Sequence, residues 1–391
     1  MLRFQTAGES HGQALVAILS GLPAGLSVDF AYVDRELGRR QGGYGRGERM
    51  KVESDCAQFL SGVRHGRTVG SPITILVANR DWENWKEVMA VEDSAETRTE
   101  YKPLSAPRPG HADLAGCLKY NFHDARYVLE RASARETAAR VAAGALAKLF
   151  LKEFGIEVAS HVVALGQVAL SGEPVHFARV LALRDREEVG LGCVDPAVEA
   201  RMKDEVDRAI ADRDTVGGTF EVIARGVPPG LGSCAQWDER LDGQLAQAVM
   251  SIQAVKAVEL GSGIANASRA GSRVHDEIGY DPALSRFTRK SNCAGGLEGG
   301  ISNGEDIVVR GHLKPIATLR KPLESVDLET KETVKAPYER SDVCVVPAAG
   351  VVGEAMVALT LVRAFLEKFG GDSMEETRRN FQAYQEQVRR F

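Results

Sequence analysis

The chain has 391 residues, with 49 lysines and arginines against 54 aspartates and glutamates, which gives a formal net charge of −5. Hydrophobic residues make up 44% of the chain and charged residues 26%, as is typical of a soluble globular protein with a sizeable core. This composition excludes a collagen-like chain, general disorder and a disulfide-rich miniprotein. The net negative charge argues against a nucleic-acid binder that relies on overall positive charge.

The N-terminal half is predicted to contain one long helix between strands. Residues 71–78 are rich in β-branched side chains and predict a strand. The helix begins where Ser133 and Glu136 have the spacing of a capping box, and it stops near Gly155. Residues 162–170 predict the next strand.

The C-terminal half alternates strands with two further long helices and ends in a polar tail. We expect strands at 219–224, 306–310 and 343–346, and helices at about 239–260 and 354–369. Both predicted helices end at a glycine, which is a common helix terminator. A polar tail helix, capped by Ser373, follows.

The order of these elements predicts a mixed α and β fold, because strands alternate with helices. No linker divides the sequence, so we expect a single domain over residues 1–391, with 372–391 as its polar C-terminal tail helix. Residues 147–155 resemble residues 362–370. This likeness indicates either two amphipathic helices that stop alike or an internal pair of pseudo-symmetric units.

The chain lacks the patterns of several common classes. We expect no signal peptide, because no basic region precedes an apolar stretch at the N-terminus. The longest apolar stretch, residues 355–366, is too short and too interrupted to cross a bilayer. The six cysteines lack metal-ligand spacing, so we expect no metal and reduced thiols in a cytoplasmic protein. P-loop, Rossmann, HExxH and GxSxG patterns are absent as well.

Two histidines stand in glycine-containing loops. His11 lies between Gly8 and Gly12, where it can approach a ligand closely and donate a proton near neutral pH. His111 follows a Pro109–Gly110 turn that would present it in the same way. Each can equally be a structural histidine bonded within its own turn, and the sequence leaves both interpretations open.

Arginines cluster at two places. Residues 39–49 hold four arginines and four glycines, which favours an anion site over a solvated basic loop. Arg131 and Arg135 stand at the predicted start of the first long helix, where the helix dipole opposes cations. They cost stability there unless a bound anion compensates, and the alternative is that both extend into water.

A third group of candidate residues lies near the C-terminus. Residues 292–304 form a glycine-rich loop, and Lys314 and Thr318 offer a cation and a hydroxyl. Asp342 follows Arg340 just before a predicted strand, as either a proton acceptor or a salt-bridge partner. Together these loops indicate an enzyme that handles small, multiply anionic ligands.

The chain resembles the chorismate synthase family in three blocks that occur in this order: residues 8–12 with 40–50, residues 131–142 and residues 340–348. The resemblance covers nearly the whole chain. It implies an α+β fold, a β-α-β sandwich with internal pseudo-symmetry, that assembles as a homotetramer. It also implies a lyase of aromatic amino-acid biosynthesis that converts 5-enolpyruvylshikimate 3-phosphate to chorismate and phosphate. The reaction is a 1,4-elimination without net redox change, in which reduced FMN transiently lends an electron.

The resemblance also implies roles for individual residues. His11 is expected to protonate the departing phosphate, His111 to lie near the N1 and O2 edge of the flavin, and Asp342 with Ser10 to serve N5. The expected anion cage is Arg40, Arg46, Arg49, Arg108, Arg135 and Arg340, of which Arg40 and Arg46 also match NADP positions. The expected FMN contacts are Arg131, Ala132, Ser133, Gln253, Ala254, Gly299, Lys314, Pro315, Ile316, Ala317, Thr318 and Arg340.

Some features stay open. Residues 290–292 differ from the Thr-Asn-Asn sequence of many relatives, and this difference leaves the contacts of that loop open. The flavin can be reduced by a separate reductase or by the protein's own use of NADPH. Two other functions are an NADPH-driven flavin reductase and a non-catalytic flavin-binding protein of the same fold. The presence of His11, His111 and Asp342 argues against a non-catalytic protein.

Overall fold

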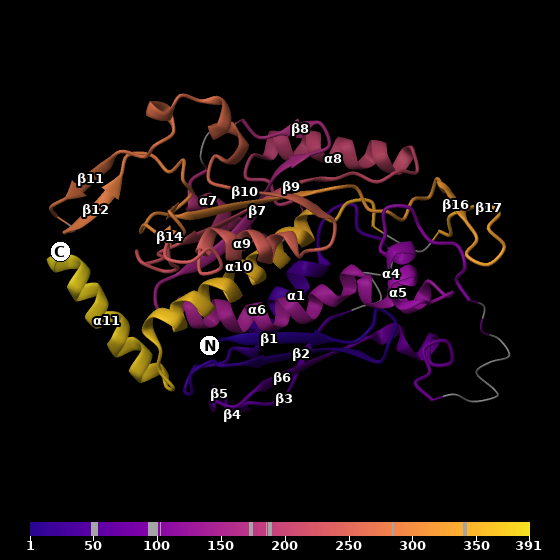
Figure 1. Cartoon of the computed structure of the whole chain (residues 1–391), viewed down its shortest axis with the longest axis horizontal. Coiled ribbons are helices and arrows are strands. Elements are labelled where there is room, and N and C mark those ends of the chain that lie inside the picture. The colour runs from indigo at the N-terminus through magenta and orange to yellow at the C-terminus, as the bar shows by residue number, and fades with distance from the viewer. Residues whose placement is uncertain are drawn as a thin grey trace.

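Two antiparallel sheets enclose a layer of helices (Figure 1). The computed structural model describes residues 1–47, 54–92, 101, 103–171, 175–184, 186, 190–283, 285–338 and 342–391. The first sheet has the strand order β1 (Arg3–Ala7), β2 (Ala14–Ser20), β6 (Ile73–Ala78) and β3 (Ala57–Ser61). Ile73, Ile75 and Val77 alternate along β6 and are buried, which confirms the predicted strand at 71–78.

The second sheet has the order β10 (Val255–Leu260), β15 (Ile307–Leu313), β9 (Gly218–Arg225), β7 (Glu157–Leu165) and β8 (Val168–Ala169). The strands predicted at 219–224 and 306–310 are confirmed within this sheet, with shifted ends. The single strand predicted at 162–170 is wrong, because β7 ends at Leu165 and Gly166, with φ of +54°, turns the chain back into the antiparallel β8. On its outer side, α7 (Phe177–Leu183) packs against Ala159 and Ile223. The inner side faces the helices.

The helix layer is built on α6 (Thr137–Lys152) and α10 (Val346–Phe369), with α1 (Phe30–Gln41) and α9 (Leu241–Met250) beside them. Small residues bring the two long helices close together: a Cβ on Gly144 would lie only 2.3 Å from the Cβ of Ala355. In the same way, Gly353 of α10 admits the ring of Phe220 from β9. The α+β sandwich is therefore confirmed, and the two similar sequence segments form the ends of α6 and α10.

The structure corrects the start of α10. The helix begins at Val346, eight residues before the predicted start, with Pro347 in its first turn. The strand predicted at 343–346 is wrong, because Val343 donates its N–H to Gly45 and accepts one from Val216, so no ladder forms. By length and composition α10 could cross a membrane, yet it is the almost fully buried core helix of the sandwich.

Two further expectations need correction. The helix predicted at 239–260 ends at Met250, and Ala254, with φ of +69°, turns the chain into β10, which pairs with β15. Pairing across the sheet overrides helical periodicity there. The capping box is incomplete: Ser133 caps only the short η2 (Ala134–Glu136), and Glu136 turns its side chain elsewhere. The tail helix α11 (Met374–Arg390) is confirmed, with Ser373 accepting from the N–H of Glu376.

Short elements complete the described chain. They are β4 (Val63–Arg64), β5 (Arg67–Thr68), η1 (Arg80–Asn84), α4 (Asp113–Tyr120), α5 (Arg126–Ala132), α8 (Pro196–Ala211), η3 (Gly263–Ser268), η4 (Gly271–Arg273), β11 (Ile278–Asp281), β12 (Arg286–Arg289), β13 (Leu297–Glu298), β14 (Ile301–Ser302), β16 (Glu324–Val326) and β17 (Thr333–Lys335). All six cysteines are free thiols, as the sequence predicts.

Candidate active site

A cavity of about 820 Å³ lies where α6 and α10 begin. Thr137 of α6 and Ala348, Ala349 and Val352 of α10 line it, so the N-terminal ends of both long helices border the cavity. Free N–H groups and the helix dipoles favour a bound anion at this position. The loops that carry both histidines, the arginine clusters and Lys314 meet at the same cavity.

His11 is held by a buried carboxylate. Its Nδ1 lies 2.9 Å from Glu130 Oε1, and its backbone N–H donates to Glu130 Oε2 at 2.8 Å. The ring also stacks on Trp85, with centroids 4.0 Å apart. Burial works to raise the pKa of Glu130, but hydrogen bonds and charge from His11, with Arg126, hold that pKa below its usual value. His11 is therefore anchored by a residue that is distant in the sequence, and it presents its Nε2 edge for a ligand.

His111 has a matching arrangement. Its Nδ1 is hydrogen-bonded to Asp113, whose side chain is fully buried. Arg108 donates to the same carboxylate through its Nε at 2.9 Å and its backbone N–H at 3.0 Å. Burial works to raise the pKa of Asp113, but hydrogen bonds from His111 and Arg108 hold it far below its usual range. Both cavity histidines are thus tied through Nδ1 to a buried carboxylate.

Two buried arginines meet at one carboxylate. Arg40 donates to Asp55 Oδ2 at 2.9 Å, and Arg135 donates to the two oxygens of Asp55 at 2.6 and 2.8 Å. Burial lowers the pKa of Arg40 to about 10, against the attraction of Asp55. The Nε of Arg40 is buried and has no hydrogen-bond partner in the described part of the chain. Because two guanidinium groups share one carboxylate, a net positive charge remains, and this charge favours the binding of a further anion.

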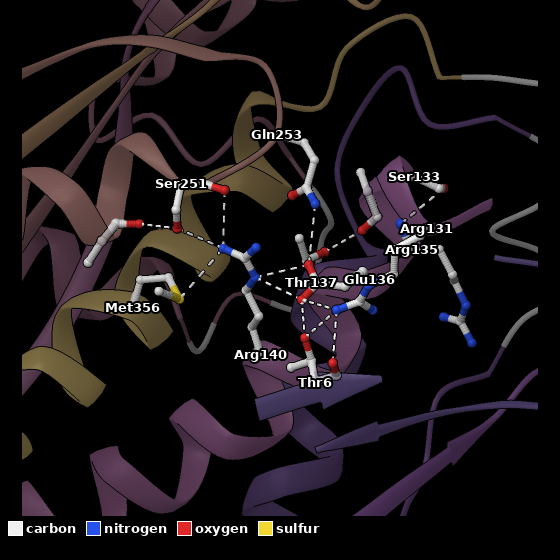
Figure 2. A network of polar contacts seen from close by, with 12 residues as sticks. Thr6, Arg131, Ser133, Arg135, Glu136, Thr137, Arg140, Ser251, Gln253 and Met356 are labelled. Atoms are coloured by element: carbon white, nitrogen blue, oxygen red, sulfur yellow. Dashed lines mark hydrogen bonds and ion pairs between the residues drawn. The ribbon is translucent and has the colours of Figure 1, made fainter. Parts of the chain in front are cut away.

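Another part of the cavity wall is fixed by a polar network around Glu136 (Figure 2). Thr6 Oγ1 donates to this carboxylate at 2.6 Å, Arg140 Nε at 2.9 Å and Gln253 Nε2 at 3.2 Å. Arg140 also donates to Ser251 Oγ at 2.8 Å, so the turn from Ser251 to Ala254 is tied to α6. Gln253 lines the cavity, and its Oε1 is buried without a partner among the described residues.

A family model described as chorismate synthase matches residues 2–366. The chain belongs to the chorismate synthase family. It is 62% identical to the chorismate synthase of Acidobacterium capsulatum and 54% identical to that of Aquifex aeolicus, over 100% of this chain and 99% or more of each relative. A crystal structure of chorismate synthase superimposes with a TM-score of 0.79 at 43% identity, over 100% of this chain and 99% of that chain.

The structure brings most of the site expected from the family resemblance into one cavity wall. The predicted residues that line it are Ser10, His11, Arg40, Arg46, Arg108, His111, Ala132, Ser133, Arg135, Gln253, Ala254, Lys314, Pro315, Ile316, Ala317, Thr318 and Asp342. Asp342 pairs with Arg46 at 2.9 Å and accepts from the N–H of Gly47. Ser10 accepts from Ser133 Oγ at 3.1 Å. Arg49 and Arg340 lie outside the described residues.

Two expected FMN positions of the chorismate synthase family are not in this wall. Gly299 lies in the turn between β13 and β14, with Cys234 beside it. Arg131 donates to the carbonyls of Thr6 and Gly8, away from the cavity. The dipole argument for Arg131 is also wrong, because this residue ends α5, where a cation is favoured.

Sequence reasoning assigns no role to several partners of the site. Asp55 and Trp85 lie in segments without a recognisable motif, and only the fold brings them to the cavity. Glu130 directly precedes the 131–142 block that resembles the chorismate synthase family, and this position is the one signal that could have indicated it. Asp113 follows His111 by two residues, and this spacing fits the pairing that the structure has.

Proposed function

We propose that the cavity binds 5-enolpyruvylshikimate 3-phosphate beside reduced FMN and that its wall performs the proton transfers of the reaction. As a chorismate synthase family member, the chain is a lyase of the shikimate pathway that converts this substrate to chorismate and phosphate. One observation carries the assignment of the cavity: Arg40 and Arg135 are both buried in its wall and both pair with Asp55. This local excess of positive charge suits a substrate with one phosphate and two carboxylates.

The residues present also fit a flavin. Gln253 offers a buried carbonyl oxygen without a partner in the described chain, and Ala132 and Ala254 contribute small apolar side chains to the same lining. When bound, reduced FMN would supply an electron transiently, which would help the phosphate leave. The residues that would hold FMN are Ala132, Ser133, Gln253, Ala254, Lys314, Pro315, Ile316, Ala317 and Thr318. The family resemblance adds Arg340, which lies outside the described residues.

His11 is proposed to protonate the departing phosphate. The bond between the ring carbon and the phosphate oxygen breaks, and its electron pair leaves with phosphate. His11 Nε2 gives its proton to that oxygen, which lowers the charge of the leaving group. The substrate loses one hydrogen at C6 in the same overall reaction, so the ring gains a double bond and the proton count balances.

His111 and Asp342 are proposed to act on the other side of the reaction. His111 is held by Asp113 and lies beside Arg108. It would offer a hydrogen-bond donor to the negative charge of a reduced flavin. Asp342 and Ser10 are a carboxylate and a hydroxyl in the same wall, and we assign them to receiving the proton that leaves the substrate. The bond from Gly47 N–H and the pair with Arg46 fix the carboxylate of Asp342.

The test is turnover without oxygen. Protein, FMN and dithionite are mixed with 5-enolpyruvylshikimate 3-phosphate, and chorismate absorbance and phosphate release are followed. Product with reduced flavin and none with oxidised flavin supports the proposal. Flavin and substrate binding without product would contradict it.

The role of His11 has its own test in the same assay. We expect His11→Asn to fold, to bind substrate and to lose about 10²- to 10⁴-fold in turnover, as removal of a general acid typically does. The parent protein measured in parallel is the reference. Turnover within a few-fold of the parent would remove His11 from the proton transfer.

The source of the reducing electrons is part of the proposal. Arg40 and Arg46 both lie in the cavity wall, so NADPH bound by them would compete with the substrate phosphate. We therefore propose a separate reductant, and NADPH oxidation by the isolated protein without substrate would contradict it. We also propose a cytoplasmic, single-domain protein that forms a homotetramer, which light scattering at increasing concentration tests.

A further inference from the structure

We infer that Glu130 is a positioning residue that keeps His11 protonated and aimed at the leaving group. The inference rests on the proposed role of His11 as a proton donor. Nothing in the family resemblance gives Glu130 a role. The contacts around its carboxylate, the stacking of Trp85 and the other charges that face the cavity support it.

Glu130 holds His11 at two points. One carboxylate oxygen accepts from the backbone N–H of His11 at 2.8 Å, and the other lies 2.9 Å from Nδ1 of the ring. The backbone carbonyl of Glu130 accepts from the N–H of Ser10 at 3.0 Å, which fixes the loop as well. An ionised carboxylate can only accept, so Nδ1 carries a hydrogen in both protonation states of His11. The transferable proton is then the one on Nε2.

Trp85 closes one face of the His11 ring. The two rings are stacked at 4.0 Å with 28° between their planes. Arg126 lies 5.1 Å from the Trp85 ring and donates to Glu130 Oε1 at 3.1 Å, so it contacts both residues that hold His11. Trp85 is fixed in turn by a 3.0 Å hydrogen bond from its Nε1 to Asp81. Rotation of the His11 ring is therefore blocked by stacking and by hydrogen bonds.

The surrounding charges make Glu130 decisive for the protonation of His11. Cations in the cavity wall disfavour a positive charge on the His11 ring. Among the described residues, Glu130 is the carboxylate paired with His11, while Asp81 accepts a hydrogen bond from Nε1 of Trp85. Among the described residues, the charged and titratable groups that face this space are Arg40, Arg46, Asp81, Arg108, His111, Arg126, Arg135, Lys314, Tyr338 and Asp342.

Glu136 supplies a matched control. Like Glu130, it is a buried glutamate that accepts from an arginine four residues away. Its other partners are Thr6, Gln253 and, at 3.8 Å, Arg131, and no histidine is among them (Figure 2). Loss of a buried negative charge is common to Glu130→Gln and Glu136→Gln. Loss of the contact with His11 is confined to Glu130→Gln.

The experiment measures the His11 ring directly. Protein with ¹⁵N-labelled histidine, free of substrate and flavin, is titrated by NMR, and the His11 signals are assigned by their absence in His11→Asn. We expect Glu130→Gln to weaken proton binding by His11 about tenfold or more, the effect of removing an opposite charge in contact. Glu136→Gln should leave it within about twofold. In turnover, Glu130→Gln should lower kcat and move the alkaline limb of the pH profile to lower pH.

Three results would overturn the inference. One is an unchanged His11 titration in Glu130→Gln, and another is an equal change in Glu136→Gln. If Glu130→Gln does not fold, Glu130→Asp keeps the charge at a longer distance and should weaken proton binding by His11 more modestly, and no change there would be the third. Failure of the proposed function shows separately, as a parent protein that makes no chorismate whatever the His11 titration gives.

Discussion

Asp55 contributes more to the stability of this protein than a surface carboxylate would, because Arg40 and Arg135 are buried around it. We expect Asp55→Asn to lower the free energy of unfolding by about 3–5 kcal/mol, since it leaves buried guanidinium groups without their counter-charge. Inorganic phosphate should recover part of this loss by binding in the cavity in place of the carboxylate. Urea denaturation with and without phosphate measures both effects.

The control for Asp55 is an exposed ion pair. Glu367 pairs with Arg363 at 3.0 Å, and both side chains are exposed, so Glu367→Gln should change the free energy of unfolding by no more than about 1 kcal/mol. It should also show no added response to phosphate. Equal stabilisation of Asp55→Asn and of the parent by phosphate would show that the anion does not replace Asp55.

At the scale of elements, the contact between α6 and α10 depends on a missing side chain. A Cβ at Gly144 would lie 2.3 Å from the Cβ of Ala355 and 2.6 Å from its Cα. We expect Gly144→Ala to push the helices apart and to cost about 1–3 kcal/mol, as overpacking typically does. Thermal unfolding measures the loss, and turnover should fall with it, since both helices begin at the cavity.

Gly38 is the matched glycine. It lies within α1 and is exposed, and a Cβ added to it would have no neighbour within 4 Å. Gly38→Ala should therefore stabilise the protein, by about 0.4–1 kcal/mol through helix propensity and a less flexible unfolded chain. If both alanine variants change the melting temperature in the same direction, the close approach of α6 and α10 does not control stability.

The helices and strands also show how much of the secondary structure could be predicted from the sequence. Strands with alternating apolar residues, such as β6, and glycine-terminated helices, such as α10, follow from local pattern. The helix predicted to continue past Met250 does not, because Val255 and its neighbours find a better partner in β15. The same limit explains Arg131: its position relative to a helix end depends on the break at Ser133, which separates α5 from α6.

At the scale of the whole molecule, the cavity gathers segments from residue 10 to residue 352. Motifs could predict that the histidines and arginines act together, because the family resemblance links them. They could not predict Trp85 or Asp55, because the contact of Trp85 with His11 and the pairing of Asp55 with Arg40 and Arg135 form only in the folded chain. The carboxylates that contact Nδ1 of His11 and of His111 are thus brought into place by the assembled sandwich. They determine which nitrogen of each ring can meet a ligand.

The assembled sandwich also has a buried four-charge cluster. Arg39 and Glu36 of α1, Lys148 of α6 and Glu354 of α10 pair with one another, and Ser160 of β7 donates to Glu354 at 2.7 Å. Two cations balance two carboxylates, so the cluster is neutral as a whole. Burial works to raise the pKa of Glu354, but Arg39 and Lys148 hold it far below its ordinary value of 4.5. The cluster connects the helix layer to the second sheet.

Acid should therefore weaken the fold through this cluster. A carboxylate with a lowered pKa in the folded state contributes stability that is fully present above its unfolded pKa and is lost as the pH falls toward the folded value. For Glu354 that loss begins as the pH falls below 4.5. Glu354→Gln should cost about 3–5 kcal/mol at neutral pH, because one buried cation loses its balance. It should also flatten the dependence of stability on pH below that point.

A double variant separates charge balance from packing. Lys148→Met with Glu354→Gln removes one charge of each sign, leaves the pair of Arg39 with Glu36 intact, and keeps an amide oxygen that can accept from Arg39. We expect it to recover much of the stability that Glu354→Gln loses, since replacing a whole buried ion pair is often neutral. Urea denaturation between about pH 2 and 7, a range that extends well below the unfolded pKa, compares the parent, single and double variants. A double variant that is less stable than the single would mean that Lys148 supports the helix layer through contacts other than its charge.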